Sequence, residues 1–144
     1  MQAVQIHNGF FFTFERGEEF IPLLTRFCEE QEVHWGQFQA IGAIEDVEIG
    51  YYDLENRQYV FRAEDGPFEV ASMDGNVAEL EESPMVHVHA VLSRCDESLE
   101  TIGGHLRRAR VAITLELSLW LVSQPLIRRL DDETGLNLIT LDSI

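Results

Sequence analysis

The chain has 144 residues, with 26 acidic side chains against 10 basic ones and a formal net charge of -16 at pH 7. This length predicts one domain over residues 1–144. The excess of negative charge repels phosphate backbones and therefore disfavours direct binding to nucleic acid. No apolar run is long enough to cross a bilayer, and the first residues lack the features of a signal peptide, so we expect a cytoplasmic protein.

All 10 basic residues are Arg. A lysine-free acidic surface fits a protein that works at high salt, where self-repulsion is screened, but it also fits an ordinary acidic protein. The sequence leaves both interpretations open. Cys28 and Cys95 belong to no paired metal or redox motif, so we expect free thiols in a reducing compartment.

The first part of the chain predicts a strand followed by a helix. Residues 2–16 alternate loosely and contain a cluster of phenylalanines, which favours a strand. Gly17, Glu18 and Glu19 open a helix with an acidic first turn, and this helix should end near His34. Its apolar stripe consists of residues at helical spacing: Phe20, Leu23, Leu24 and Phe27.

Strands and turns dominate the middle of the chain. Residues 35–52 predict a long strand, which the turn at residues 53–57 joins to a hairpin partner at residues 58–62. Residues 68–80 predict a further strand or pair of strands, interrupted at Asp74-Gly75-Asn76. A charged loop at residues 79–84 follows.

The last part of the chain predicts further strands. Residues 110–122 alternate strongly, and their apolar members should share one face: Val111, Ile113, Leu115, Leu117 and Leu119. Two short strands, at residues 124–130 and 136–141, are expected around a hairpin turn at residues 131–135. Together these elements predict an α+β fold, with a largely antiparallel sheet and one main helix packed on it.

Three histidines form the candidate site. His87 and His89 are alternate residues of the apolar run 84–92, so their side chains should point to one face of a strand. His105 follows Gly103 and Gly104, where we expect a sharp turn. Two imidazoles from a strand and one from a nearby turn can form a three-nitrogen metal site. The alternative is a pair of hydrogen-bonded histidines at a subunit interface.

Four sequence features resemble one known family. In order, they are Gly17-Glu18-Glu19, Ile41-Gly42-Ala43, Gly66-Pro67-Phe68-Glu69-Val70, and His87-Val88-His89 with Gly103-Gly104-His105-Leu106. Their order and spacing resemble the plants-and-prokaryotes-conserved (PPC) domain over nearly the whole chain. The resemblance is to the stand-alone form of bacteria and archaea. Plant nuclear proteins carry the domain beside AT-hooks, and this chain has no Arg-Gly-Arg-Pro hook.

The resemblance implies one helix packed on an antiparallel sheet, and a homotrimer. It also implies that His87, His89 and His105 hold a metal, with zinc the first candidate. Plant members lack these histidines and serve as assembly and partner-binding modules. Prokaryotic members are often described as DNA-binding, which the charge of this chain speaks against.

Three functions remain open. The first is a trimeric module that holds one metal per subunit and binds a small ligand or a partner protein. The second is a zinc-dependent hydrolase or lyase, because three imidazoles leave a fourth zinc position open and zinc-bound water ionises near neutral pH. No catalytic residue can be assigned; Glu69 and Glu116 are the nearest candidates for a general base, and a structural role suits both better. The third is a DNA-associated regulator.

Two smaller patterns have competing interpretations. Arg107, Arg108 and Arg110 either pair with the surplus carboxylates or form an anion site beside the metal. Gly103 and Gly104 are too short a signal for a phosphate-binding loop. We also expect metal release below a pH of about 6, because a ligating imidazole must be neutral and its free pKa is about 6.5.

Overall fold

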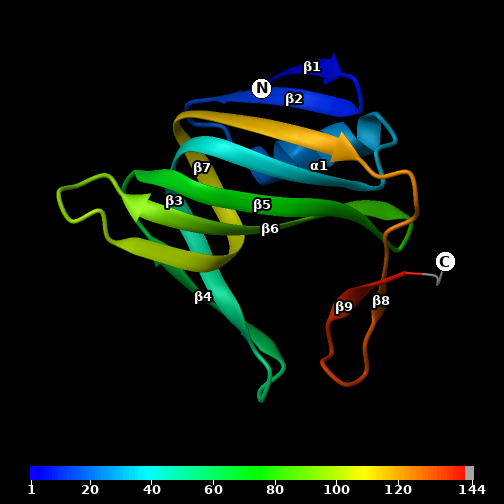
Figure 1. Cartoon of the computed structure of the whole chain (residues 1–144). Coiled ribbons are helices and arrows are strands. Elements are labelled where there is room, and N and C mark those ends of the chain that lie inside the picture. The colour runs from blue at the N-terminus through cyan, green and yellow to red at the C-terminus, as the bar shows by residue number, and fades with distance from the viewer. Residues whose placement is uncertain (142–144) are drawn as a thin grey trace.

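The fold is a nine-stranded, mostly antiparallel sheet with one helix against it (Figure 1). The computed structural model describes residues 1–141, and residues 142–144 of the predicted domain lie outside the described residues. The elements are β1 (Gln2–Ile6), β2 (Gly9–Glu15), α1 (Phe20–Glu30), β3 (Gly36–Asp53), β4 (Gln58–Glu64), β5 (Phe68–Leu80), β6 (Ser83–Arg94), β7 (Thr101–Leu121), β8 (Ile127–Leu130) and β9 (Asn137–Thr140). The prediction of an α+β fold with a largely antiparallel sheet is confirmed.

A hairpin of β1 and β2 replaces the single strand predicted over residues 2–16. Phe12 and Phe14 of β2 are fully buried. Phe12 meets Phe27 of α1 edge to face, with ring centroids 4.8 Å apart. Aromatic pairs of this geometry add about 0.5–1.5 kcal/mol beyond their buried area. The phenylalanine cluster therefore fixes the helix against the sheet.

Helix α1 is shorter than predicted at both ends. It begins at Phe20, so Glu18 and Glu19 precede its first turn, and the Glu18 carboxylate pairs with the N-terminal ammonium instead. It ends at Glu30, ahead of His34, because Glu32 takes a left-handed φ of 53°. The predicted stripe is confirmed, and its members contact the core: Phe20, Leu23, Leu24 and Phe27. Among the described residues, no helix has the length and apolar character to span a bilayer.

The long strands β3 and β7, of 18 and 21 residues, organise the sheet. They pair with each other over most of their length, and β3 also pairs with β4 and β5. Because β5 pairs with β6 and β6 returns to β7, these strands close into a ring around the apolar core. The β8–β9 hairpin joins the edge of β5, and Figure 1 shows it projecting in the same direction as the β3–β4 hairpin.

Strand β5 runs unbroken through Asp74-Gly75-Asn76, where an interruption was predicted. Gly75 is needed there for space. A Cβ at this position would lie 2.1 Å from the ring of Phe38 and 2.5 Å from the carbonyl oxygen of His87. This glycine therefore lets strands and an aromatic ring approach closely without breaking the strand.

The predicted loop at residues 79–84 is a tight hairpin turn between β5 and β6. Only Glu81 and Glu82 lie between the two strands, and both have positive φ, at 51° and 66°. Two consecutive residues of positive φ are the geometry of a type I′ turn, whose twist matches that of the flanking strands. The turn thus fixes the register of the histidine strand β6 against β5.

Strand β7 contains Gly103-Gly104-His105, which were predicted to form a turn. The prediction of a turn is wrong. The glycines instead allow a close approach of backbones, since a Cβ on Gly104 would lie 2.4 Å from the carbonyl oxygen of Gly50 on β3. His105 consequently extends from a strand that is held on both sides by its neighbours.

The predicted apolar face of residues 110–122 is interrupted by a bulge. The β3–β7 register shifts between the pairs Gly42–Leu115 and Ile44–Val111. Ile113 lies opposite this shift and is 68% exposed, whereas the neighbouring Leu115 is fully buried. The prediction for Ile113 is therefore wrong, because the bulge reverses the alternation at this point.

Candidate metal centre

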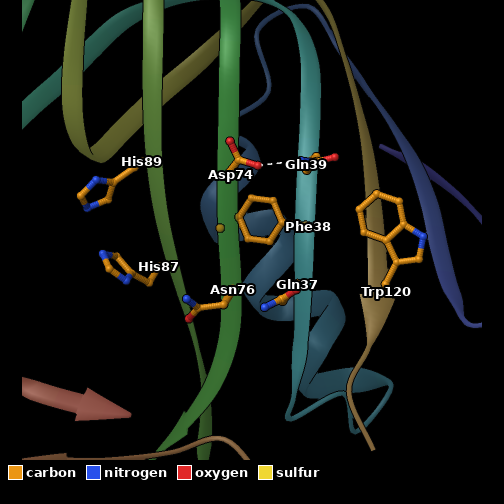
Figure 2. Close-up of a pocket in the computed structure, with 9 residues that line it drawn as sticks. Gln37, Phe38, Gln39, Asp74, Asn76, His87, His89 and Trp120 are labelled. Atoms are coloured by element: carbon orange, nitrogen blue, oxygen red, sulfur yellow. Dashed lines mark hydrogen bonds between the residues drawn. The ribbon is translucent and has the colours of Figure 1, made fainter.

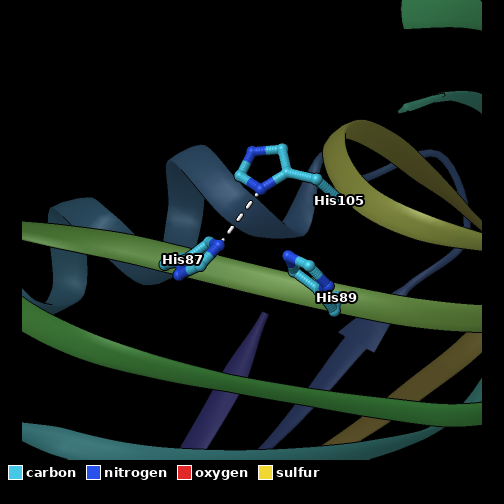
Figure 3. A group of neighbouring side chains, drawn as sticks. All are labelled: His87, His89 and His105. Carbon is cyan, nitrogen blue, oxygen red and sulfur yellow. Dashed lines mark hydrogen bonds between the residues drawn. The ribbon is translucent and has the colours of Figure 1, made fainter. Parts of the chain in front are cut away.

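The three predicted histidines lie together at the seam between β6 and β7 (Figure 3). His89 is the register partner of His105 across this pair of strands, and His87 lies two residues earlier on β6. His87 Nε2 is 3.1 Å from His105 Nδ1. One ring nitrogen of each histidine lies within 4.8 Å of the other two. Strand alternation and the close approach at Gly104 together create this cluster.

The nitrogen positions fit the donor set of a tetrahedral ion. Zinc–nitrogen bonds of about 2.0–2.1 Å place two ligand nitrogens about 3.3 Å apart. The His87–His105 separation of 3.1 Å is close to that value. The His89 side chain is exposed, and one of its ring nitrogens lies within 4.8 Å of a nitrogen of each of the other two. Three imidazoles would leave one position of such an ion open.

Burial keeps two of the rings in the form that binds metal. Desolvation, followed by the nearby charges of His105, Arg128 and His89, lowers the pKa of His87 from 6.5 to about 4. Desolvation also lowers the pKa of His105, with a smaller effect from His89 and Arg128. Both imidazoles are therefore neutral at pH 7, which ligation requires.

Arg128, which was not among the residues predicted from the sequence, also contacts the histidine cluster. Its guanidinium reaches the histidines from β8. Nη2 donates to Asn76 Oδ1 at 2.8 Å and lies 3.3 Å from His87 Nδ1, and Nη1 donates to the carbonyl oxygen of Asn137 at 3.0 Å. Because Arg is only a donor, His87 Nδ1 accepts in this contact and the ring proton is on Nε2. A metal on Nε2 would move that proton to Nδ1, so metal ligation through this atom would displace Arg128.

A cavity of about 600 Å³ opens beside His87 and His89 on the outer face of the sheet (Figure 2). Asp74 and Asn76 of β5, the register partners of His89 and His87, form part of its wall, and Trp120 lies at the far side. Gln39 and Ser72 donate to the Asp74 carboxylate at 2.8 and 2.9 Å. These hydrogen bonds lower the pKa of Asp74 below 3.8.

A second cavity, of about 340 Å³, lies on the other side of the cluster between the β3–β4 and β8–β9 hairpins. His87, His105, Arg128 and Arg57 contribute to its wall together with Tyr59. The ring of Tyr59 packs on His105, with centroids 4.7 Å apart. The histidines thus separate two hollows of different composition.

The other predicted site residues lie elsewhere or have structural partners. Glu69 and Glu116 belong to the walls of neither of these two cavities. The clustered arginines form ion pairs with carboxylates, the first of the two predicted interpretations: Arg107 with Glu48, Arg108 with Glu19, and Arg110 with Glu45 and Asp46.

Comparison with known proteins decides the family. A model described as the Plants and Prokaryotes Conserved (PCC) domain matches residues 1–122. The chain belongs to this family. This confirms the resemblance to the PPC domain that the sequence showed. None of the curated proteins compared with the chain matches it.

Solved structures share the fold over almost the whole chain. A metal-containing protein from Archaeoglobus fulgidus is 32% identical, with a TM-score of 0.83 and coverage of 98% of this chain and 100% of that one. A plant- and prokaryote-conserved protein from Pyrococcus horikoshii is 25% identical, with a TM-score of 0.83 and coverage of 99% and 96%. A candidate DNA-binding protein from Bacteroides thetaiotaomicron is 22% identical, with a TM-score of 0.90 and 96% coverage of both chains, which shows the fold alone.

Proposed function

We propose that this protein is a cytoplasmic, homotrimeric metal-binding module of the PCC family. Each subunit holds one divalent ion, with zinc as the first candidate, on His87, His89 and His105. The open position of the ion receives a small ligand or a group from a partner protein. The observation that supports this most directly is the clustering of three imidazole nitrogens within 4.8 Å. The metal-containing Archaeoglobus protein adds support at 32% identity.

The assembly part of the proposal is supported by apolar side chains on the outer face of β3 and β7. Ile41, Ile113 and Trp120 are 65%, 68% and 41% exposed. Burying such groups against other subunits would remove apolar surface from water. Cys28 and Cys95 are both free, which suits a reducing compartment.

Binding suits the site better than catalysis by a hydrolase or lyase. The carboxylate that shares a cavity with His87 and His89 is Asp74. Its lowered pKa makes it a weak proton acceptor, whereas an efficient general base has a pKa near the working pH. The enzyme alternative therefore lacks a suitable base among the residues near the histidines.

A DNA-associated role is not favoured either. The net charge is -16, and Arg107, Arg108 and Arg110 are already neutralised by carboxylates. Because affinity for duplex DNA depends on cations that contact phosphates, we expect no mobility shift at moderate salt.

Metal analysis of histidine variants tests the proposal. Protein purified without a His-tag and equilibrated with zinc should hold one ion per subunit. Replacing His87, His89 or His105 by Ala removes a ligand, so the affinity for zinc should fall by more than the roughly 10–100-fold cost of losing a residue that only hydrogen-bonds to a ligand. His7→Ala is the matched control, since this exposed histidine lies in the β1–β2 turn. Metal content that is equal in all these variants would refute the site.

A further inference from the structure

Arg128 is a buried cation, and no acidic side chain among residues 1–141 pairs with it. It is 8% exposed, and within the same residues its Nε atom has no hydrogen-bond partner. Its contacts are with the neutral groups of Asn76, Asn137 and His87. Six of the other arginines form ion pairs with acidic side chains, whereas Arg128 forms none among residues 1–141.

This arrangement is costly in a protein with so many carboxylates. Moving a charge out of water is unfavourable unless an opposite charge or a full set of hydrogen bonds compensates. The chain has 26 acidic residues, so a carboxylate would be the ordinary partner. The surroundings of Arg128 therefore suit an anion from outside the chain.

A metal on the histidines would increase the need for that anion. Neutral imidazoles bring no negative charge to the ion, and Arg128 lies 3.3 Å from His87. A divalent ion would place two positive groups side by side and would displace the guanidinium from His87 Nδ1. An acidic group between them would compensate both charges.

The space for such a group is the cavity of about 340 Å³ between the β3–β4 and β8–β9 hairpins. Arg128 and Arg57 both belong to its wall, as do His87 and His105. Arg57 donates to the carbonyl oxygen of Glu133 at 2.9 Å and keeps its other donors available. Planar guanidinium groups match the oxygens of carboxylates and phosphates.

We propose that this cavity binds the acidic group, carboxylate or phosphate, of a small-molecule ligand, with Arg128 as its counter-charge and the metal site at its other end. The metal-facing half of the proposal rests on the proposed function. The anion subsite itself consists of protein groups alone. The ligand class of the module would thus be small organic acids or phosphorylated compounds of a size that fits this cavity.

Anion binding to the full chain tests the proposal. Metal-loaded and metal-free protein are titrated calorimetrically with inorganic phosphate and, separately, with acetate, at constant ionic strength and pH 7. The anion that binds more tightly identifies the acidic group. Arg128→Gln should weaken its binding by about tenfold or more, as expected for loss of a charge-assisted bidentate contact. Metal content of the same samples is measured in parallel.

Arg129→Gln is the matched control. This neighbour on β8 is exposed, and its replacement gives the same change in net charge. The anion affinity of the Arg129→Gln variant should therefore stay within about twofold of that of the original chain. If Arg128→Gln fails to fold, Arg57→Gln offers an exposed second variant on the opposite side of the cavity, with a several-fold loss expected. An unchanged affinity in that variant would then overturn the proposal.

The outcomes separate this proposal from the proposed function. If the protein takes up no metal when it is equilibrated with zinc but still shows Arg128-dependent anion binding, the result would support the subsite and refute the metal module. Metal-loaded protein that binds neither anion would overturn the subsite alone. Equal losses of anion affinity in Arg128→Gln and Arg129→Gln would also overturn the subsite, since they would show that binding depends on the net charge of the protein and not on a specific contact with Arg128.

Discussion

The imidazole of His87 is neutral because of its position in the fold. Packing between β5 and β7 removes it from water, and Arg128 opposes a second positive charge beside it. These effects keep the ring neutral, as ligation requires, although ligation through Nε2 would still displace Arg128 from Nδ1. They also place the expected release of metal at a lower pH than the value of about 6 predicted from a free imidazole.

The same shift predicts a pH-dependent stability for the metal-free protein. His87 takes up a proton near pH 6.5 when unfolded and near pH 4 when folded. Between these values the unfolded state binds more protons, so the stability is complete above about 6.5 and is lost as pH falls toward 4. His87→Asn should remove this dependence.

Urea unfolding in the presence of a chelator, at several pH values, measures the effect. The carboxylates titrate alike in both proteins, so the difference in unfolding free energy between the original chain and His87→Asn isolates the histidine. That difference should be constant above pH 7 and should change in favour of the variant below about 6.5. A difference that does not vary with pH would contradict the shift.

The strand β7 holds its histidine in place through a glycine. A Cβ on Gly104 would lie 2.4 Å from the carbonyl oxygen of Gly50, so Gly104→Ala forces β7 away from β3. We expect a loss of about 1–3 kcal/mol in unfolding free energy, the usual cost of overpacking, and weaker metal binding because His105 moves. Urea unfolding and zinc titration measure the two effects.

The adjacent glycine provides the control for this experiment. A Cβ on Gly103 would lie no nearer than 3.3 Å to another atom, the carbonyl oxygen of Ala90. Gly103→Ala should therefore have a small effect on both stability and metal affinity. Similar losses in the two variants would show that the close approach to β3 is not what positions His105.

The elements that the sequence predicted correctly depend on local periodicity. The hairpins of β3 with β4 and of β8 with β9, and the common face of His87 and His89, follow from alternation and turn residues. The glycines of β5 and β7 were misassigned because a glycine that turns the chain and one that yields space to a neighbour look alike in sequence. Only the neighbouring strand distinguishes them.

In the candidate site too, the sequence predicts the residues that follow a local pattern and misses those brought in by distant contacts. The histidines share one pattern, and Asp74 could have been found from its alternation with Asn76 across from β6. Arg128 could not, because it meets His87 from 41 residues away through the docking of the β8–β9 hairpin. A contact between two residues this far apart in the sequence leaves no local periodic pattern from which it could be predicted.

At the scale of the whole molecule, charge and apolar surface act against each other. The chain carries a formal charge of -16, so copies of it repel one another. The exposed Ile41 and Ile113 on the outer face of β3 and β7 favour association. Screening by salt weakens the repulsion and leaves the apolar contribution, because the Debye length falls from about 10 Å at 0.1 M to about 3 Å at 1 M.

For the proposed trimer of the 16.5 kDa chain, we therefore expect the resistance to dilution to increase with KCl. Light scattering after gel filtration at low and high KCl measures its mass. Ile113→Glu adds a charge to the proposed interface and should shift the protein toward monomer. Leu54→Glu is the control, since Leu54 is 60% exposed in the turn at the tip of the β3–β4 hairpin. A monomer at every salt concentration would mean that the outer face is not an interface between copies. The cavity of about 600 Å³ on that face would then be accessible to partner molecules.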